Sequence, residues 1–221
     1  MAAEETGMTA IDPPRPDASA PPLWAQELLR SLVPLSSEET IPGDLLEAYR
    51  DAVRPSRGRW RANLWYLGQV AGFLFRLAWV FVVLNAAAVI LRTILDTFLP
   101  PHSYQLRSAW SGNAAIATFL LAGIYGGYRV GRVRAGMLAA VTASAVGHTL
   151  ALIVGVVLFH TVIRNDPAKL TLFYVTGGWD EAIGMPVIIT FIAAVLGSCG
   201  GLCGKYLSRL PGRRFAARPS A

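Results

Sequence analysis

The sequence predicts an all-α integral membrane protein with four transmembrane helices and a short cytosolic helical module at its N-terminus. Hydrophobic residues make up 53% of the 221 residues and charged residues only 15%, against roughly 25% charged residues in ordinary soluble domains. The charges also cluster in residues 1–61 and 205–221, and long runs between them carry almost none. Because an ionised side chain at the centre of a bilayer costs at least about 2.5–3.5 kcal/mol on insertion scales, this distribution is typical of a membrane protein.

The N-terminal part divides into a tail and a helical module. Residues 1–21 are acidic, rich in proline and without an apolar core, so they predict a disordered tail rather than a cleaved signal peptide. Residues 22–72 predict a cytosolic or interfacial module of two short amphipathic helices, the first ended by Pro34 and the second begun by Pro42. Helices of this size bury little area alone, so we expect them to lean on another part of the chain. Their apolar positions are Leu28, Leu29, Leu32, Val33, Leu45, Leu46, Tyr49 and Val53.

The transmembrane domain is predicted over residues 73–204. Four apolar segments in it reach the roughly 20 residues that cross about 30 Å of hydrocarbon at about 1.5 Å per residue. Residues 164–182, between the last two segments, are too apolar for a free loop and too short to span, and they predict an interfacial or re-entrant piece. Residues 205–221 form a basic cytosolic tail. The four predicted spans are residues 73–91, 110–128, 135–160 and 183–203.

Lysine and arginine in the flanks of these segments predict the orientation. The flank before the first span, the connection 129–134 and the C-terminal tail are basic. Apart from Arg92, which bounds the first span, the other two connections hold only Arg107, Arg164 and Lys169. With four crossings the three basic flanks share one side, so the positive-inside rule places both termini in the cytoplasm and the chain in the inner (plasma) membrane. Because the charges flank apolar runs, the net charge of +6 does not indicate nucleic acid as a partner.

The stretch RGRWR, residues 57–61, leads three arginines towards the first span. Two interpretations stay open for Arg54, Arg57, Arg59 and Arg61: a signal for orientation alone, or anchors that fasten the module to the anionic inner leaflet of the lipid bilayer. The second depends on spacing, because Arg57 and Arg61 are four apart and share a face in a continuous helix, with Arg54 one turn earlier.

Small residues recur at helical spacing within the predicted spans. Steps of three and four put Gly123 and Gly127, Gly147, and Gly197 and Gly201 on helix faces where backbones can approach closely. We interpret these glycines as packing positions within one chain, and a homo-oligomer interface is the alternative.

Few polar residues lie inside the predicted spans. Asn85 and His148 are near mid-membrane, and Ser144 precedes His148 by one helical turn. An intramembrane ionisable residue is a candidate functional site. A neutral His148 that bonds to Ser144 or to a neighbouring helix is the simpler interpretation. In the functional alternative the three residues line the pathway of a small oligomeric transporter or channel.

Signatures of catalysis and of metal or cofactor binding are missing from the sequence. It contains no GxSxG, HExxH or Walker motif and no acidic pair within a predicted span. Cys199 and Cys203, four apart in an apolar segment, match neither a disulfide framework nor a metal-ligand set, and we interpret them as small packing residues. The sequence therefore predicts no catalytic residue, no cofactor and no metal site.

Residues 22–75 carry one resemblance to a known family. The stretches PPLWAQELLRSLVP and IPGDLLEAYRDAVRPSRGRWRANLWYLGQV, with their paired leucines and the GDLLEAYR element, resemble the permease prefix domain found in bacteria ahead of FtsX-like ABC permeases. The resemblance implies a helical cytosolic module at the root of the first span, and no catalytic residue. Such a permease would next show a large extracytoplasmic domain, where this chain has about 18 residues, so permease activity is not implied. We expect a non-enzymatic partner or regulatory component of a transport-related membrane assembly.

Overall fold

The computed structural model of the chain describes residues 20–99 and 101–210, and all regular structure in these ranges is helical. The prediction of an all-α chain is confirmed for this part. Most of the predicted tail 1–21 and most of the basic tail 205–221 lie outside the described residues. The long and short helices are α1 (Leu23–Leu32), α2 (Thr40–Ala48), α3 (Arg54–Phe98), α4 (Tyr104–Val130), α5 (Val133–Leu158), α6 (Pro167–Val175) and α7 (Gly178–Arg209). Single helical turns are η1 (Leu35–Ser37), η2 (Tyr49–Val53), η3 (Pro101–Ser103) and η4 (Phe159–Ile163).

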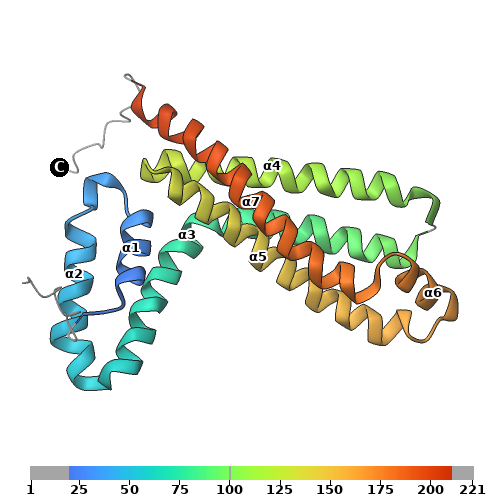
Figure 1. Cartoon of the computed structure of the whole chain (residues 1–221), viewed down its shortest axis with the longest axis horizontal. Helices are drawn as coiled ribbons and strands as arrows, with labels where there is room; N and C mark the ends of the chain where they lie inside the picture. The colour runs from blue at the N-terminus through green and yellow to red at the C-terminus, as the bar shows by residue number, and fades with distance from the viewer. Residues whose placement is uncertain (1–19, 100, 211–221) are drawn as a thin grey trace, which may run out of the picture.

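The N-terminal module is built on the first half of α3. Helix α1 lies beside it at one end of the molecule, and α2 lies on the far side of α1 and leads into α3 through η2 (Figure 1). Leu29 and Val33 are fully buried, as the apolar stripe of the first helix predicts. Tyr49 joins the module to α3: its ring meets that of Tyr66 edge-on at 6.0 Å between centroids, and its hydroxyl donates to Asn63 Oδ1 at 2.6 Å. The module therefore shares its apolar core with α3 instead of standing alone.

The start of α3 corrects one premise of the sequence analysis. Gly58 has φ 73° and ψ 164°, which is not helical, so a break separates Arg57 from Arg59. The prediction that Arg57 and Arg61 share one face of a continuous helix is wrong. Glycine is suited to this break because it has no Cβ to clash at positive φ. From Arg59 onward the helix runs without interruption into the predicted first span.

The second half of α3 packs with α4, α5 and α7 into a helical bundle, with α7 lying across α4 and α5 (Figure 1). The interior of the bundle is rich in small side chains, among them Ala139 and Ala143 of α5, both fully buried, and Phe119 of α4 is a large side chain buried with them. Large apolar side chains point outward instead: Phe191 is 74% exposed and Ile153 56% exposed. Monomeric soluble proteins rarely expose large contiguous apolar patches, whereas close packing through small residues is typical of helices in lipid.

Three helices among the described residues are long and apolar enough to cross a membrane. They contain the predicted spans 73–91 (in α3), 135–160 (in α5 and η4) and 183–203 (in α7). Helix α4 contains the predicted span 110–128 and covers about 40 Å at about 1.5 Å per residue, but its first half is polar. The structure is thus consistent with a membrane protein, and the fourth span stays a prediction.

The two ends of the bundle differ in what they carry. We call the end with the α4–α5 turn, the C-terminus of α7 and the N-terminal module the module end, and the opposite end, with α6, the α6 end (Figure 1). At the α6 end, the segment predicted to be interfacial or re-entrant forms α6, and Asp166 caps it by accepting from the backbone N–H groups of Ala168 and Lys169. The rings of Phe159, Phe173 and Trp179 pack together beneath it.

Candidate functional site

The predicted packing glycines lie at the contacts between helix backbones. A Cβ built on Gly123 of α4 would stand 2.5 Å from the carbonyl oxygen and 2.9 Å from the Cα of Gly197 on α7. Gly127 faces Gly201 in the same way, one turn further along. Glycine at 123 and 127 lets α4 and α7 approach at a distance that no other residue permits. A Cβ on Gly197 or Gly201 would instead meet α5, so these two glycines let α7 approach α5. The contacts are within one chain, which is the first of the two interpretations given above for these residues.

Gly147 has a different role from the other four glycines. A Cβ at this position would meet the Asn85 Nδ2 at 2.5 Å, so the glycine makes room for a side chain of α3. Asn85 is fully buried and its Nδ2 donates to the carbonyl of Ala143 at 3.2 Å. The Asn85 Oδ1 is buried without a hydrogen-bond donor in the described part of the chain. Asn85 thus links α3 to α5 at the cost of one unsatisfied acceptor.

Ser144 and His148 form the second polar contact inside the bundle. The Nδ1–H of His148 lies 2.8 Å from the Ser144 carbonyl oxygen, one turn back on α5. The Ser144 hydroxyl lies 3.0 Å from that of Thr190 on α7. The hydrogen bond of Thr190 was not predicted from the sequence, because its partner lies on another helix and no local sequence pattern indicates it. The structure places Ser144 and His148 in contact and links them to α7, while Asn85 bonds elsewhere.

An ion-pair network closes the α6 end. Asp96 near the end of α3 accepts from Arg107 of α4 at 2.5 Å and from Arg92 at 3.2 Å. Arg107 is 9% exposed, and Arg92 also donates to the Tyr104 hydroxyl at 3.0 Å. Asp96 therefore ties together the two helices that meet at this end, with its charge shared between two guanidinium groups.

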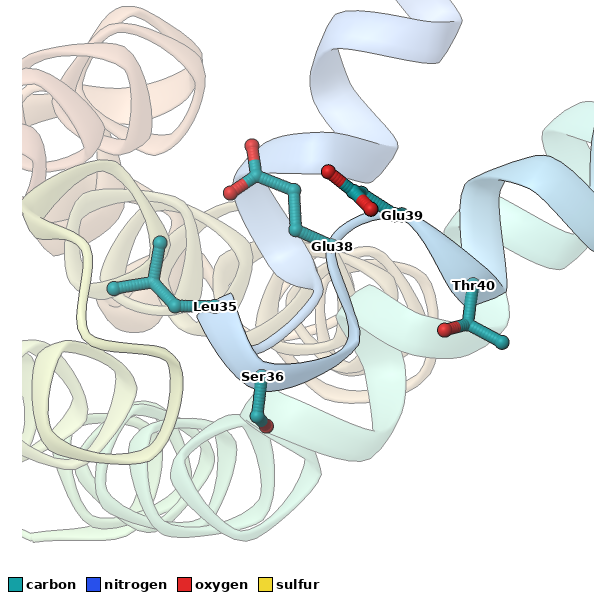
Figure 2. A pocket seen from close by; sticks show the side chains of 5 residues that line it. All are labelled: Leu35, Ser36, Glu38, Glu39 and Thr40. Atoms are coloured by element: carbon teal, nitrogen blue, oxygen red, sulfur yellow. The ribbon is translucent and has the colours of Figure 1, made fainter.

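The module end carries two shallow pockets around the α1–α2 connection. The first, of about 250 Å³, is lined by Leu35, Ser36, Glu38, Glu39 and Thr40. Figure 2 shows both carboxylates on the same side of the turn, with Leu35 pointing away from Thr40. Glu38 is paired with Arg132 of the α4–α5 turn, which fastens the module to the bundle.

The second pocket, of about 460 Å³, lies next to the first and shares Leu35 with it. Four of its lining residues are cations: Arg132, Arg134, Lys205 and Arg209.

The arginines predicted to anchor the module lie at its surface. Arg57, Arg59 and Arg61 are exposed and Arg54 is partly exposed. Trp60, between them, is 74% exposed and Leu64 is 50% exposed. Apolar and cationic side chains are thus exposed together over the first turns of α3, as an interfacial segment requires.

No group of three or more histidine, cysteine or acidic residues that could hold a metal occurs among residues 20–99 and 101–210. Cys199 and Cys203 are exposed on α7, so our interpretation of them as small packing residues is wrong. Comparisons with protein-family models, curated proteins and solved structures find no match to the chain. The resemblance of residues 22–75 to the permease prefix domain stays a prediction.

Proposed function

We propose that the chain is a non-enzymatic, four-span protein of the bacterial inner membrane whose N-terminal module, residues 22–72, docks a membrane-protein partner. In this proposal it is a partner or regulatory component of a transport-related assembly, and both termini are cytoplasmic. The transport-related part depends on the resemblance of the module to the permease prefix domain.

One observation carries the docking proposal: the module is packed firmly on α3 and yet leaves large apolar side chains uncovered. Leu23 is 69% exposed and Trp24 is 57% exposed at the start of α1, on a part of the molecule that lies beyond the end of the bundle (Figure 1). Exposed aromatic residues are enriched where proteins bind one another. The buried core of the module includes Leu29 and Tyr49, both fully buried, whereas Leu23 and Trp24 stay largely outside it.

The distribution of charge supports the orientation. The α6 end carries as many carboxylates (Asp96, Asp166, Asp180, Glu181) as lysines and arginines (Arg92, Arg107, Arg164, Lys169), and Asp96 and Asp166 form ion pairs there. At the module end the α4–α5 turn and the last turns of α7 carry five cations (Arg129, Arg132, Arg134, Lys205, Arg209), and Glu38 is the carboxylate paired there. An excess of cations on one side favours the cytoplasm for the module end.

The alternative, a small oligomeric transporter or channel with a pathway near Asn85, Ser144 and His148, has less support. Asn85 and Ser144 are fully buried between helices of a single copy. Their hydrogen bonds to α5 and α7 account for their presence.

Site-specific photo-cross-linking in intact cells tests the docking function. A photoreactive amino acid replaces Trp24 in the full chain, and in a matched control it replaces Trp79, an equally large residue that is 51% exposed on the bundle. We expect a discrete protein adduct from position 24 and lipid adducts from position 79. Equal adduct patterns at the two positions would contradict a docking role for the module.

Reporter fusions test the four-span topology separately. Reporters after residue 221 and within 129–134 should be cytoplasmic, and reporters within 103–108 and 166–180 should be external. An external C-terminal reporter would show that the number of spans is wrong.

A further inference from the structure

The second pocket at the module end, here called the basic pocket, is lined by Ser31, Leu35, Gly131, Arg132, Val133, Arg134, Lys205 and Arg209. We propose that the basic pocket binds a phosphate-bearing anion, supplied either by the headgroup of an anionic phospholipid or by a free phosphate compound. The inference goes beyond the proposed function, because it depends neither on a partner of the module nor on which side of the membrane the pocket faces.

The charge of the pocket is the first observation. No acidic side chain lines it, and its cations come from two separate segments, the α4–α5 turn and the last two turns of α7. No ion pair joins Arg134, Lys205 or Arg209 to a carboxylate in the described part of the chain. Gathering like charges without a counter-charge is unfavourable unless an anion compensates them.

Arg132 is the second observation, independent of the first. Glu38 binds its terminal nitrogen, but its Nε is buried and has no acceptor among the described residues. Buried donors are nearly always paired in proteins. The Arg132 side chain is 27% exposed and lines the pocket, and an oxyanion that reached its Nε would give this donor an acceptor.

The backbone at the pocket also suits an anion. Gly131 ends α4 with φ 79°, and Arg132 is extended, so α5 begins within the pocket. Within the described ranges, no side chain caps the start of α5 with a hydrogen bond. These groups and the positive end of the helix favour negative charge. Leu35 forms one wall, since a Cβ on Gly131 would lie 3.1 Å from the Leu35 Cδ1.

The position of the pocket along α7 favours a lipid headgroup over a free phosphate compound as the source of the anion. Lys205 and Arg209 follow directly on the apolar part of α7 that is able to cross a membrane. Cations at this position lie at the depth of the lipid headgroups, where basic pockets between helices bind phosphate-rich lipids. A lipid with two phosphates and negative charge on both fits three uncompensated cations better than a zwitterionic lipid does.

The test is a lipid titration of the full-length protein in neutral detergent, followed by native mass spectrometry. The probes are cardiolipin, phosphatidylcholine and inorganic pyrophosphate. The double variant Arg134→Gln/Lys205→Gln removes two pocket cations, and the matched control Arg30→Gln/Arg129→Gln removes two exposed cations that do not line the pocket. A cation beside an anionic surface changes affinity about fivefold, so the pocket variant should weaken cardiolipin binding on the order of 25-fold. The control variant should change the affinity for cardiolipin by less than about threefold. Added salt should weaken the binding of cardiolipin to the parent protein.

The remaining arms identify the source and guard against misfolding. If pyrophosphate binds the parent protein in the absence of lipid, and this binding also depends on Arg134 and Lys205, the ligand is a free phosphate compound. If cardiolipin binds and pyrophosphate does not displace it, the ligand is the lipid. Lys205→Arg keeps the charge and should keep the affinity. Thermal melting in lipid-free detergent checks that each variant is folded. If the double variant does not fold, Arg209→Gln, at an exposed position, takes its place. Equal losses in pocket and control variants, or equal affinity for phosphatidylcholine, would overturn the proposal.

Discussion

The contact between Gly123 and Gly197 gives the sharpest test of the bundle. Gly123→Ala adds one methyl group, whose carbon would stand 2.5 Å from the Gly197 carbonyl oxygen, where ordinary contacts lie at 3.4–4 Å. The obstructing atoms are backbone, so no side chain can rotate away, and α4 must move from α7 by about 1 Å. Overpacking of this kind costs about 1–3 kcal/mol, partly offset by the helix preference of alanine over glycine, up to about 1 kcal/mol.

Gly112→Ala is the matched control on the same helix. It makes the same chemical change where a Cβ meets nothing within 4 Å, so only the gain in helix preference remains. Because the gain in helix preference is common to both, the two variants should differ by the overpacking cost, about 1–3 kcal/mol, or roughly 2–12 °C in melting temperature for a chain of this size. The assay is thermal unfolding of the purified protein in neutral detergent. If Gly112→Ala and Gly123→Ala melt at the same temperature, the close glycine contact does not exist in the folded protein.

Three further predictions concern polar contacts. Asp96→Asn leaves the guanidinium groups of Arg92 and Arg107 facing each other, and because Arg107 is 9% exposed the loss should be about 2–3 kcal/mol; a change in melting temperature no larger than that of Asp180→Asn would refute it. The interpretation of His148 as a neutral ring that donates to the Ser144 carbonyl predicts that melting of both the parent and His148→Gln varies by less than about 2 °C between pH 5 and 8; a pH dependence that the variant abolishes would favour a titrating role. Tyr49→Phe removes the bond to Asn63 and should cost about 1 kcal/mol, whereas Tyr49→Ala should cost about 3–5 kcal/mol and make residues 22–72 sensitive to protease; equal sensitivity in the two variants would contradict the shared core.

The apolar helices could be predicted from sequence because hydrophobicity is a local property. Residues 73–91, 135–160 and 183–203 carry their own evidence for crossing a membrane, whatever they contact. The same is true of Pro34, which ends the first helix by its own chemistry. The capping of α6 was equally local, since Asp166 followed by Pro167 is typical of a helix start, and this indication was missed.

The contacts that the sequence did not predict are those between distant segments. Ser144 meets Thr190 across 46 positions, and Glu38 meets Arg132 across a still longer interval. No spacing rule within one helix relates such residues. Gly58 belongs to the same class, because a glycine between two arginines is compatible with a helix, and its positive φ arises where η2 turns back onto α3. Local sequence pattern predicts the individual helices, whereas packing determines which helices contact one another.

The shared core of module and bundle determines how docking has to be tested. Deleting the chain up to Leu64 would remove Tyr49 and uncover Tyr66 and Val70, which are 1% and 2% exposed. It would also remove Glu38 and leave Arg132 without its carboxylate. If such a deletion abolished partner binding, the cause could be either the damage to α3 or the loss of the module surface, and the experiment would not distinguish them. A change at Trp24 alters an exposed side chain above an intact core, so a lost partner in that variant can be attributed to the surface of the module itself.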